Sequence, residues 1–403
     1  MLQFRGMTTE FFIRNRAALA KKIGGIPIVI CAYTLLQRSG DAAFHFEQEA
    51  NFWYLTGIES PNWTLVIHGT KEYLIAPEVS EVHQLFEGSL STASAKKVSG
   101  VQYILSASEG ETLLDELAGK SKAVATIGED QHVEQYDFAL NPGPVEMLKK
   151  LRTVFGEVED CRHDLAILRA IKTPEEIQLI RNAIQLTING FDAVRNNIHH
   201  YSFEYEIEAE FTHYFRKNGA TGHAYDPIVA TGKNACTLHY VQNQAALNSG
   251  EYVLLDIGAR LDGYAADITR TYAYGQVSER HQAVHAAVES AHVEIIALLR
   301  PGLSVKEYFK KVDDIMTEAL RGLGLLNDTS DYRKYFPHSI SHGLGIDVHD
   351  SLGGPDVFAP GMVLTVEPGI YIPEEGIGVR IEDDILITEV GHENLSARLP
   401  TSL

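Results

Sequence analysis

Residues 251–275, EYVLLDIGARLDGYAADITRTYAYG, place acidic side chains inside two apolar strands, where charged groups are unexpected. The pattern predicts a hairpin with its turn at residues 261–263. Each strand carries one acid, Asp256 in the first and Asp267 in the second. A tight turn centred between Leu261 and Asp262 makes these two acids direct cross-strand neighbours. A turn one residue longer sends one acid outward to solvent, and the hairpin alone leaves both registers open.

Facing carboxylates need a positive charge between them. Two such groups about 5 Å apart repel each other by roughly 3 kcal/mol at an effective dielectric constant of about 20. A divalent cation with oxygen ligands relieves this repulsion. The hairpin therefore favours a metal site, with solvated acids as the alternative.

A second pair of acids follows the same pattern. Glu367 ends the apolar run of residues 362–366, and Glu382 lies inside the run of residues 378–387. A hairpin centred on Glu374 and Glu375 brings these two acids face to face, although Pro368 could break the register. A buried carboxylate without a partner costs several kcal/mol or takes up a proton, so two hairpins with buried acid pairs argue against chance.

Three histidines lie within twelve residues between the two hairpins, in PHSISHGLGIDVHD at residues 337–350. Glycines disfavour a helix here and allow close approach to a site, while imidazole is the commonest nitrogen ligand. The alternative is a solvated loop with incidental histidines. Four carboxylates and one histidine suit a pair of divalent ions that share bridging carboxylates and a bridging hydroxide, which indicates hydrolysis.

Other histidines and glycine-rich stretches of the chain do not indicate a further site. His281, His285 and His292 lie at helical spacing, and we expect a solvated helix face rather than a zinc site. His199 and His200 are expected in an exposed loop. The chain has no GxGxxG and no P-loop motif, which argues against nucleotide binding.

The 403 residues suggest two domains, an α/β domain over residues 1–160 and an α+β domain over residues 161–403. The first has strand candidates at residues 26–30, 52–57, 64–68, 73–76 and 123–127, and a helix after the turn at residues 141–144. The second has helices that start near residues 174, 202, 278 and 304, between strand-rich segments.

Composition excludes several classes of partner. The formal charge is −20, from 34 basic and 54 acidic residues, which argues against nucleic acid and anionic membrane. Three widely spaced cysteines fit a reducing compartment. The N-terminus lacks the apolar core of a signal peptide, and the longest apolar run, residues 26–36, is too short to span a bilayer. We therefore expect a cytoplasmic protein.

Together these segments resemble the pita-bread metallopeptidases, in particular the Xaa-Pro aminopeptidase and Xaa-Pro dipeptidase (prolidase) subgroup. The resemblance rests on LLDIGARLDGYAADITRTY, HSISHGLGIDVHD, TVEPGIYI, GVRIEDDILIT and AYDPIVATGKNACTLHY. QEANFWYLTGIESPNWTLVI is similar to the N-terminal domain of bacterial aminopeptidase P. The implied fold is an α+β pita-bread (creatinase/aminopeptidase-like) catalytic domain preceded by a smaller α/β domain.

The resemblance also implies a role for each site residue. Two divalent ions, most often Mn²⁺ with Zn²⁺, Co²⁺ or Fe²⁺ as alternatives, would be held by Asp256, Asp267, His342, Glu367 and Glu382, with Asp267 and Glu382 bridging them. The implied catalytic residues are His239, His349, Glu367, Arg380 and Tyr371. The implied substrate-binding residues are His239, His338, His349 and Tyr225, with His338 lining the pocket for the proline ring.

The implied activity is hydrolysis of X-Pro bonds at peptide N-termini through a metal-bridging hydroxide. The implied partners are peptides with proline at the second position and further copies of the chain, as a homodimer or homotetramer. A dipeptidase, a non-catalytic pita-bread binding module and a metal-free hydrolase of the creatinase type remain as alternatives.

Overall fold

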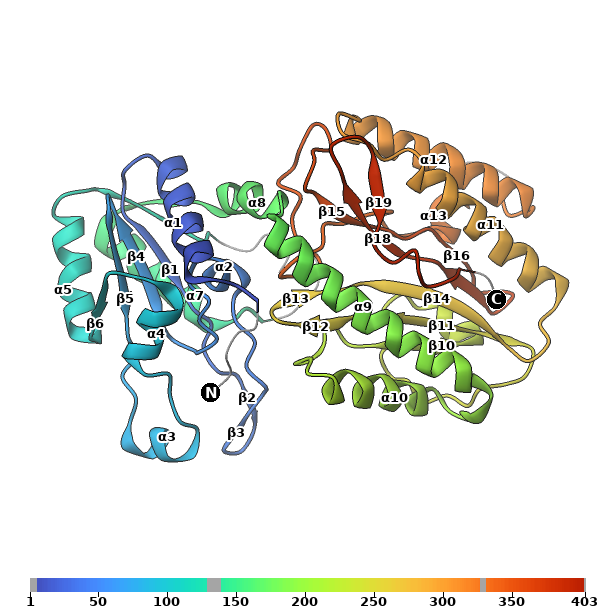
Figure 1. The fold of residues 1–403 in the computed structure, drawn as a ribbon, viewed down its shortest axis with the longest axis horizontal. Helices are drawn as coiled ribbons and strands as arrows, with labels where there is room; N and C mark the ends of the chain where they lie inside the picture. The colour runs from blue at the N-terminus through green and yellow to red at the C-terminus, as the bar shows by residue number, and fades with distance from the viewer. Residues whose placement is uncertain (1–5, 129–138, 327–330, 402–403) are drawn as a thin grey trace. The chain divides into compact units, whose positions relative to one another are not determined.

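The computed structural model describes residues 6–128, 139–326 and 331–401, which form two compact units (Figure 1). One unit comprises Met7–Leu168, and the other comprises Arg169–Leu403 together with Gly6. Among the described residues, no helix is both long and apolar enough to cross a bilayer.

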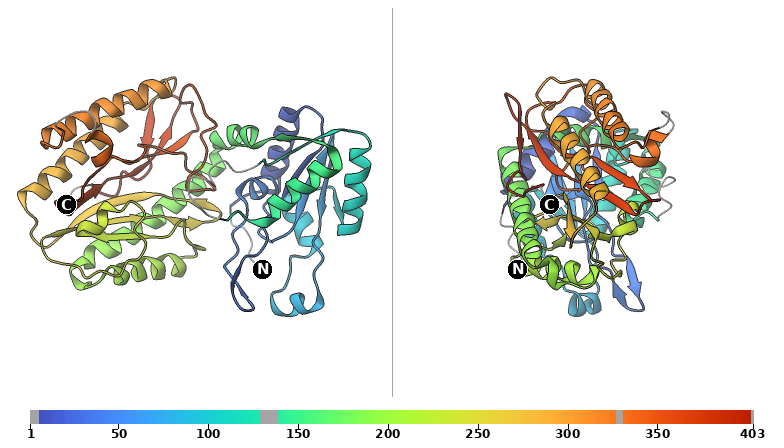
Figure 2. Two further views of the ribbon diagram at one scale, coloured as in Figure 1. Left: turned by 180° about the vertical axis from the view of Figure 1, so that it is seen from behind. Right: turned by 90° about the vertical axis from the view of Figure 1, so that its right-hand side faces the viewer.

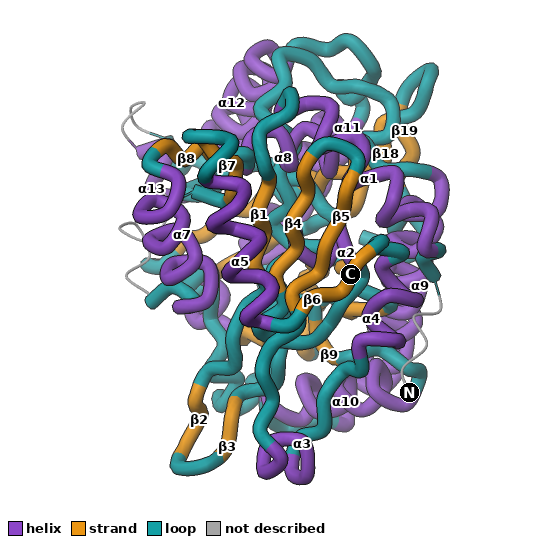
Figure 3. The backbone as a smooth tube through the Cα atoms, turned by 90° about the vertical axis from the view of Figure 1, so that its left-hand side faces the viewer, coloured by secondary structure: helices purple, strands orange, loops and turns teal. Residues whose placement is uncertain are grey.

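The first unit is built on a mixed six-stranded sheet, in which β1, β4 and β5 lie side by side (Figure 3). The strand order is β6-β5-β4-β1-β7-β8, with β1 (Ile28–Cys31), β4 (Thr64–His68), β5 (Lys71–Ile75), β6 (Tyr103–Leu105), β7 (Ala123–Thr126) and β8 (Glu157–Asp160). A separate hairpin is formed by β2 (Gln37–Ser39) and β3 (Ala42–Ala43). The helices are α1 (Thr9–Ile23), α2 (Ala50–Thr56), α3 (Glu81–Phe86), α4 (Thr92–Ser99), α5 (Ala107–Ala118) and α7 (Pro142–Phe155), and α8 (Arg162–Ala170) leads into the second unit.

One strand prediction in this unit is wrong. Residues 52–56 belong to helix α2 and Gly57 is its C-cap, and the first turn is capped by the Glu49 carboxylate, which accepts from the Phe52 amide at 2.6 Å. Gly57 ends the helix with a φ of +67°. Because the helix is buried on nearly all sides, its sequence is as continuously apolar as that of a buried strand, and the two cannot be told apart by composition.

The second unit consists of two halves, each with a pair of long helices and antiparallel strands. The first half contains α9 (Pro174–Asn197), η1 (Ile198–His200), α10 (Glu204–Lys217), β9 (Gly222–His223), β10 (Ile228–Thr231), η2 (Gly232–Cys236), β11 (Glu251–Ile257), β12 (Ala259–Leu261), β13 (Tyr264–Ala265) and β14 (Ile268–Tyr274). The second half contains α11 (Glu279–Ile296), α12 (Val305–Gly322), α13 (Tyr332–Tyr335), β15 (Val363–Val366), β16 (Gly369–Ile372), β17 (Ile377–Arg380), β18 (Asp383–Ile387) and β19 (His392–Asn394).

Helices cover the strands of this unit from two opposite sides (Figures 1 and 2). The pair α9 and α10 lies outside the strands of the first half, and the pair α11 and α12 lies outside those of the second. Both hairpins thus lie in the interior between the helix pairs, and the predicted α+β architecture is confirmed.

The second hairpin has the predicted register. Gly369 pairs with Arg380, and Val366 pairs with Asp383, so the turn is centred between Glu374 and Glu375. The pairing is interrupted next to Pro368, where β15 gives way to β16. Glu367 and Glu382 lie in this interruption.

The first hairpin is shifted from its predicted register. Asp262 and Gly263 have φ angles of +51° and +86°, so they form the two central positions of the turn. Asp256 therefore pairs with Thr269 rather than with Asp267, and the predicted direct pairing is wrong. Because the shift is two residues, both acids stay on one face.

The two halves meet at the acid pairs. An isolated antiparallel bridge joins Thr269 of β14 to Glu382, and the Glu382 amide donates to the Thr269 carbonyl at 3.1 Å. This bridge brings the acid of one hairpin next to the acid of the other.

The expectation of a solvated histidine face on α11 is wrong. His285 and His292 are only 3% and 2% exposed. His285 packs near the ring of Tyr252, and Nε2 of His292 lies 3.4 Å from Oδ2 of Asp383. Helix α11 is buried over a wider arc than its aliphatic stripe indicates.

Candidate metal centre

Asp256 and Asp267 converge on one phenol group. The hydroxyl of Tyr225 donates to Oδ1 of Asp256 at 2.5 Å and lies 2.6 Å from Oδ1 of Asp267. Gly258 makes room for this contact, because a Cβ there would lie 2.8 Å from the Tyr225 ring and 1.8 Å from the Ala266 carbonyl oxygen. Asp256 and Asp267 are both buried.

Threonines orient the two glutamates. The hydroxyl of Thr269 donates to Oε2 of Glu382 at 2.7 Å, and that of Thr365 lies 3.3 Å from Oε1 of Glu367. Glu382 is almost fully buried, whereas Glu367 keeps an open side. These contacts fix each carboxylate through one oxygen and leave its other oxygen for a further partner.

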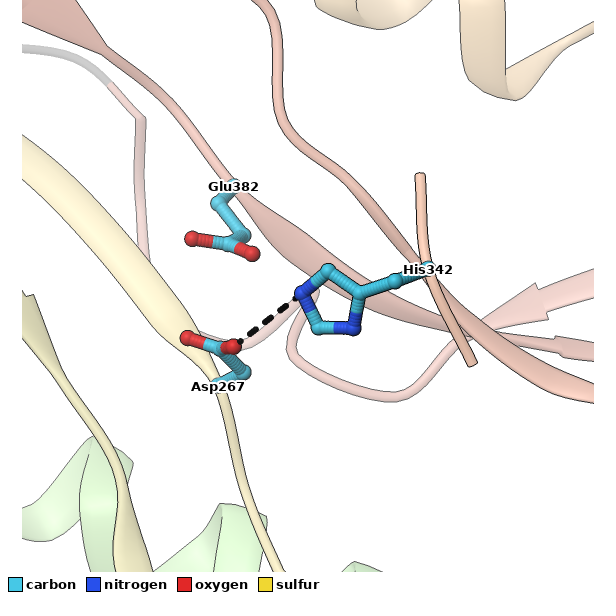
Figure 4. Close-up of side chains that lie close together, drawn as sticks. All are labelled: Asp267, His342 and Glu382. Atoms are coloured by element: carbon cyan, nitrogen blue, oxygen red, sulfur yellow. Dashed lines mark ion pairs between the residues drawn. The ribbon is translucent and has the colours of Figure 1, made fainter. Parts of the chain in front are cut away.

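His342 faces the acids with one ring nitrogen (Figure 4). Its Nδ1 donates to the Gly343 carbonyl at 2.9 Å. Its Nε2 lies 3.5 Å from Oδ2 of Asp267 and 3.6 Å from Oε1 of Glu367. One ligand atom from each of Asp267, His342 and Glu382 lies within 4.8 Å of the others, a spacing that suits a common cation.

The acids crowd one another electrostatically. Burial and the neighbouring acids raise the pKa of Glu382 well above its ordinary value, and burial also raises the pKa of Asp267. Burial, opposed by His342, raises the pKa of Glu367 to about 7. A cluster of buried acids that resists ionisation, with an imidazole nitrogen turned toward it, fits bound divalent cations.

A hydrogen-bonded chain runs from the acids to the cavity wall. Nη2 of Arg380 donates to Oδ2 of Asp256 at 2.5 Å, and Nη1 donates to the Tyr371 hydroxyl at 2.8 Å. That hydroxyl lies 2.9 Å from Nε2 of His338, whose Nδ1 contacts the Ser339 carbonyl at 2.7 Å. Because a carbonyl only accepts, Nδ1 of His338 carries the hydrogen and Nε2 accepts from Tyr371. Burial and the charge of Arg380 lower the pKa of His338 to about 3, so its ring is neutral.

A cavity of about 280 Å³ opens over the acids. Its wall contains every residue expected at the site except Tyr371, which contacts Arg380 and His338: Tyr225, His239, Asp256, Asp267, His338, His342, His349, Glu367, Arg380 and Glu382. His239 and His349 are exposed there. Apolar side chains of Ile228, Leu238, Val241 and Val348 complete the wall, so the cavity combines an acid floor with apolar and imidazole sides.

Thr269, Thr365 and Asp384 belong to the site but were not predicted from the sequence. Asp384 is fully buried, and its Oδ2 accepts from the Asp267 amide at 3.2 Å. In the observed register Thr269 lies directly opposite Asp256, so the Asp262-Gly263 turn signal could have identified it.

Comparison with known proteins places the chain in a family. Residues 178–389 match the model of metallopeptidase family M24, and residues 12–125 match that of the aminopeptidase P N-terminal domain. The chain belongs to metallopeptidase family M24. It is 34% identical to the Xaa-Pro aminopeptidase of Haemophilus influenzae, over 98% of this chain and 95% of the relative. The Xaa-Pro aminopeptidase of Escherichia coli is also 34% identical, over 97% of this chain and 95% of the relative.

Solved structures of this M24 type share the whole fold. Aminopeptidase P from E. coli with the inhibitor Pro-Leu superimposes with a TM-score of 0.87 at 32% identity, covering 98% of this chain and 97% of the other. Zinc-substituted E. coli aminopeptidase P in complex with product gives a TM-score of 0.84 at 31% identity, with the same coverage. The expected pita-bread domain behind an aminopeptidase P-like N-terminal domain is confirmed, and the chain is a metallopeptidase.

Proposed function

We propose that this M24 metallopeptidase is an Xaa-Pro aminopeptidase, which removes the first residue from peptides with proline at the second position. The observation that carries the proposal is the convergence of four acids and His342 beneath a cavity walled by His239, His338 and His349. Full-length similarity to Xaa-Pro aminopeptidases favours this activity over a dipeptidase. All five ligand positions hold ligating side chains, which argues against a non-catalytic module and against a metal-free hydrolase.

Two divalent ions, most often Mn²⁺ in the resembling family, are the proposed cofactor. Asp256, Asp267, His342, Glu367 and Glu382 would hold these ions. When bound, such ions acidify water and polarise a carbonyl oxygen. The buried acids supply the negative charge that these ions require.

The remaining steps are assigned to side chains of this chain. Glu367 would accept a proton from the attacking water and pass it to the leaving proline nitrogen, because its carboxylate is the acid with an open side. His239 and His349 would donate hydrogen bonds to the oxygen that gains negative charge. His338, held by Tyr371, would form the wall against the proline ring. Arg380 and Tyr225 would keep Asp256 oriented.

A substrate-length series with metal-reconstituted protein tests the activity. An X-Pro-Y tripeptide and a longer X-Pro peptide should both lose their first residue, and an X-Ala-Y tripeptide should be cut far more slowly. Cleavage of the X-Pro dipeptide alone would overturn the proposal in favour of a dipeptidase. If none of these peptides is cleaved, the proposed function is wrong altogether.

The proposed assembly is a cytoplasmic homodimer or homotetramer, as the family resemblance implies. The free thiols of Cys31, Cys161 and Cys236 are compatible with a reducing compartment. Light scattering after size-exclusion chromatography tests the assembly, and a monomer at micromolar concentration would contradict it.

A further inference from the structure

Residues 342–350 form a closed loop with a site histidine near each end. The rings of His342 and His349 lie with their centroids 4.3 Å apart and their planes at 69°. The first is a proposed metal ligand, and the second faces the cavity. The loop must therefore hold both rings in a fixed relation.

The His342 end of the loop is tied to strand β15. The His342 amide donates to the Thr365 hydroxyl at 3.1 Å, and the Thr365 amide donates to the His342 carbonyl at 2.9 Å. The Leu344 amide donates to the Val363 carbonyl at 3.0 Å. These contacts anchor His342 through the backbone of a buried strand.

The His349 end is held by the next residue, Asp350. Its amide donates to the Gly343 carbonyl at 2.8 Å, which closes the loop. Its side chain is 2% exposed and is a carboxylate inside the protein. Burying a carboxylate is costly unless cations and hydrogen-bond donors pair with it.

Two buried cations provide those partners. Nη2 of Arg169 lies 2.9 Å from Oδ1 of Asp350, and Nζ of Lys172 lies 3.3 Å from Oδ2. The Ser351 amide also donates to Oδ1, at 2.8 Å. The side chains of Arg169 and Lys172 are 7% and 1% exposed. Arg169 also contacts Oδ2 of Asp347 at 2.7 Å, so it grips the loop twice.

The loop glycines are explained by this cluster. A Cβ on Gly345 would lie 2.1 Å from Oδ2 of Asp350 and 3.1 Å from Cε of Lys172. A Cβ on Gly343 would lie 2.4 Å from the Asp350 carbonyl oxygen. Side chains at these two positions would push Asp350 away from its partners. The glycines are therefore needed for the ion cluster to form.

We propose that Asp350, gripped by Lys172 and Arg169, is a positioning residue that fixes His349 over the metal centre. The cluster is a costly way to gain stability, because desolvation of buried ions offsets most of their attraction. The ion cluster instead fixes the backbone at Asp350 and so gives the preceding residue, His349, a single orientation. The catalytic consequence rests on the proposed function, because it requires His349 to act on the substrate.

A double-mutant cycle on the full chain tests this role. With metal and an X-Pro-Y tripeptide, Asp350→Asn should lower kcat by about 10- to 100-fold. In a His349→Ala background the same substitution should change kcat by less than about twofold, because the residue to be positioned is gone. An equal loss in both backgrounds would overturn the proposal. Glu393→Gln is the matched control, since it removes an exposed carboxylate paired with Arg181.

A second variant separates positioning from folding. Asp350→Asn alone leaves the buried Lys172 without its carboxylate and Arg169 with only that of Asp347, so the melting temperature should fall. Lys172→Met combined with Asp350→Asn restores the charge balance, so the melting temperature should recover in part while kcat stays low. Recovery of kcat together with stability would overturn the positioning role.

Hydrogen exchange tests the loop without any activity. In metal-free protein, Asp350→Asn should speed amide exchange in residues 343–350 and leave strand β11 unchanged. Unchanged exchange in the loop would overturn the proposal. If the wild type cleaves no X-Pro peptide, the proposed function fails. If His349→Ala is fully active, the role of His349 in catalysis fails. In both cases faster exchange in the loop of Asp350→Asn would still show that Asp350 holds residues 343–350 in place.

Discussion

Nε2 of His338 lies 2.9 Å from the hydroxyl oxygen of Tyr371, which also accepts a hydrogen bond from Arg380. One phenol group thus connects the cavity wall to the guanidinium that holds Asp256. The Arg380 guanidinium can only donate, so the Tyr371 hydroxyl accepts from Arg380 and donates its own hydrogen to Nε2 of His338. The orientation of the imidazole is therefore set by a residue behind it.

Replacing Tyr371 with Phe should break this connection. Arg380 loses a buried acceptor and His338 loses its donor, so kcat/KM for an X-Pro-Y tripeptide should fall by about 10- to 100-fold. The free energy of unfolding should fall by about 1–3 kcal/mol. Tyr272→Phe is the control, since the buried Tyr272 hydroxyl has no hydrogen-bond partner among the described residues. Equal effects of the two substitutions would refute the connection.

Glu367→Gln should remove activity while the fold persists. The amide keeps the shape of the side chain but cannot take up a proton, and loss of a general base costs about 10²- to 10⁴-fold in kcat. Bound metal, measured by elemental analysis, should fall as well. Glu375→Gln, which alters an exposed partner of Arg280, should leave both measurements unchanged. Full activity of Glu367→Gln would contradict the assigned role.

Gly258→Ala should damage the site through Tyr225. The new Cβ would overlap the Ala266 carbonyl oxygen and crowd the Tyr225 ring, so the strand must shift beneath Asp256 and Asp267. We expect a lower melting temperature and at least a tenfold loss of kcat/KM. Gly222→Ala is the matched control, since a Cβ on Gly222 would meet nothing within 4 Å. If the two variants behave alike, the close approach at Gly258 is unimportant.

His223 should make stability depend on pH. Burial, opposed by Asp226, lowers the pKa of His223 to about 4, from an ordinary value near 6.5. On acidification His223 therefore takes up a proton at a higher pH in the unfolded chain than in the folded protein. The free energy of unfolding should fall as the pH drops from about 6.5 toward 4. His223→Gln should reduce this slope by up to about 1.4 kcal/mol per pH unit.

Denaturant unfolding of both proteins at saturating metal, between pH 4 and 7, measures the difference. His213→Gln, on an exposed position of the adjoining helix α10, should leave the slope unchanged. Parallel curves for the wild type and His223→Gln would show that His223 takes no part.

The sequence predicted the second hairpin better than the first for a physical reason. Turn residues 373–376 fix one register, and the interruption at Pro368 follows from its missing amide hydrogen. In the first hairpin, Asp262 and Gly263 tolerate positive φ, and the turn that they form lies one residue later in the chain than the predicted turn. The acids still fell on one face, since side chains alternate with a period of two.

Contacts between segments that are distant in the sequence could not be predicted from local sequence patterns. Thr269 contacts Glu382 only because the two halves pack together, and no periodicity within β14 indicates which strand end it meets. Lys172 and Asp350 lie far apart in the sequence, and each looks like an ordinary surface charge. The buried His285 and His292 show the same limit, because a helical stripe does not reveal how far a helix is enclosed.

The bridge between Thr269 and Glu382 has a consequence for how the protein matures. Asp256 and Asp267 leave the ribosome more than a hundred residues before Glu382, so an emerging chain carries only some of the proposed metal ligands. On the proposed ligand set, metal binding would have to wait until the last strands have docked, and peptidase activity would be among the last properties that the newly made chain acquires.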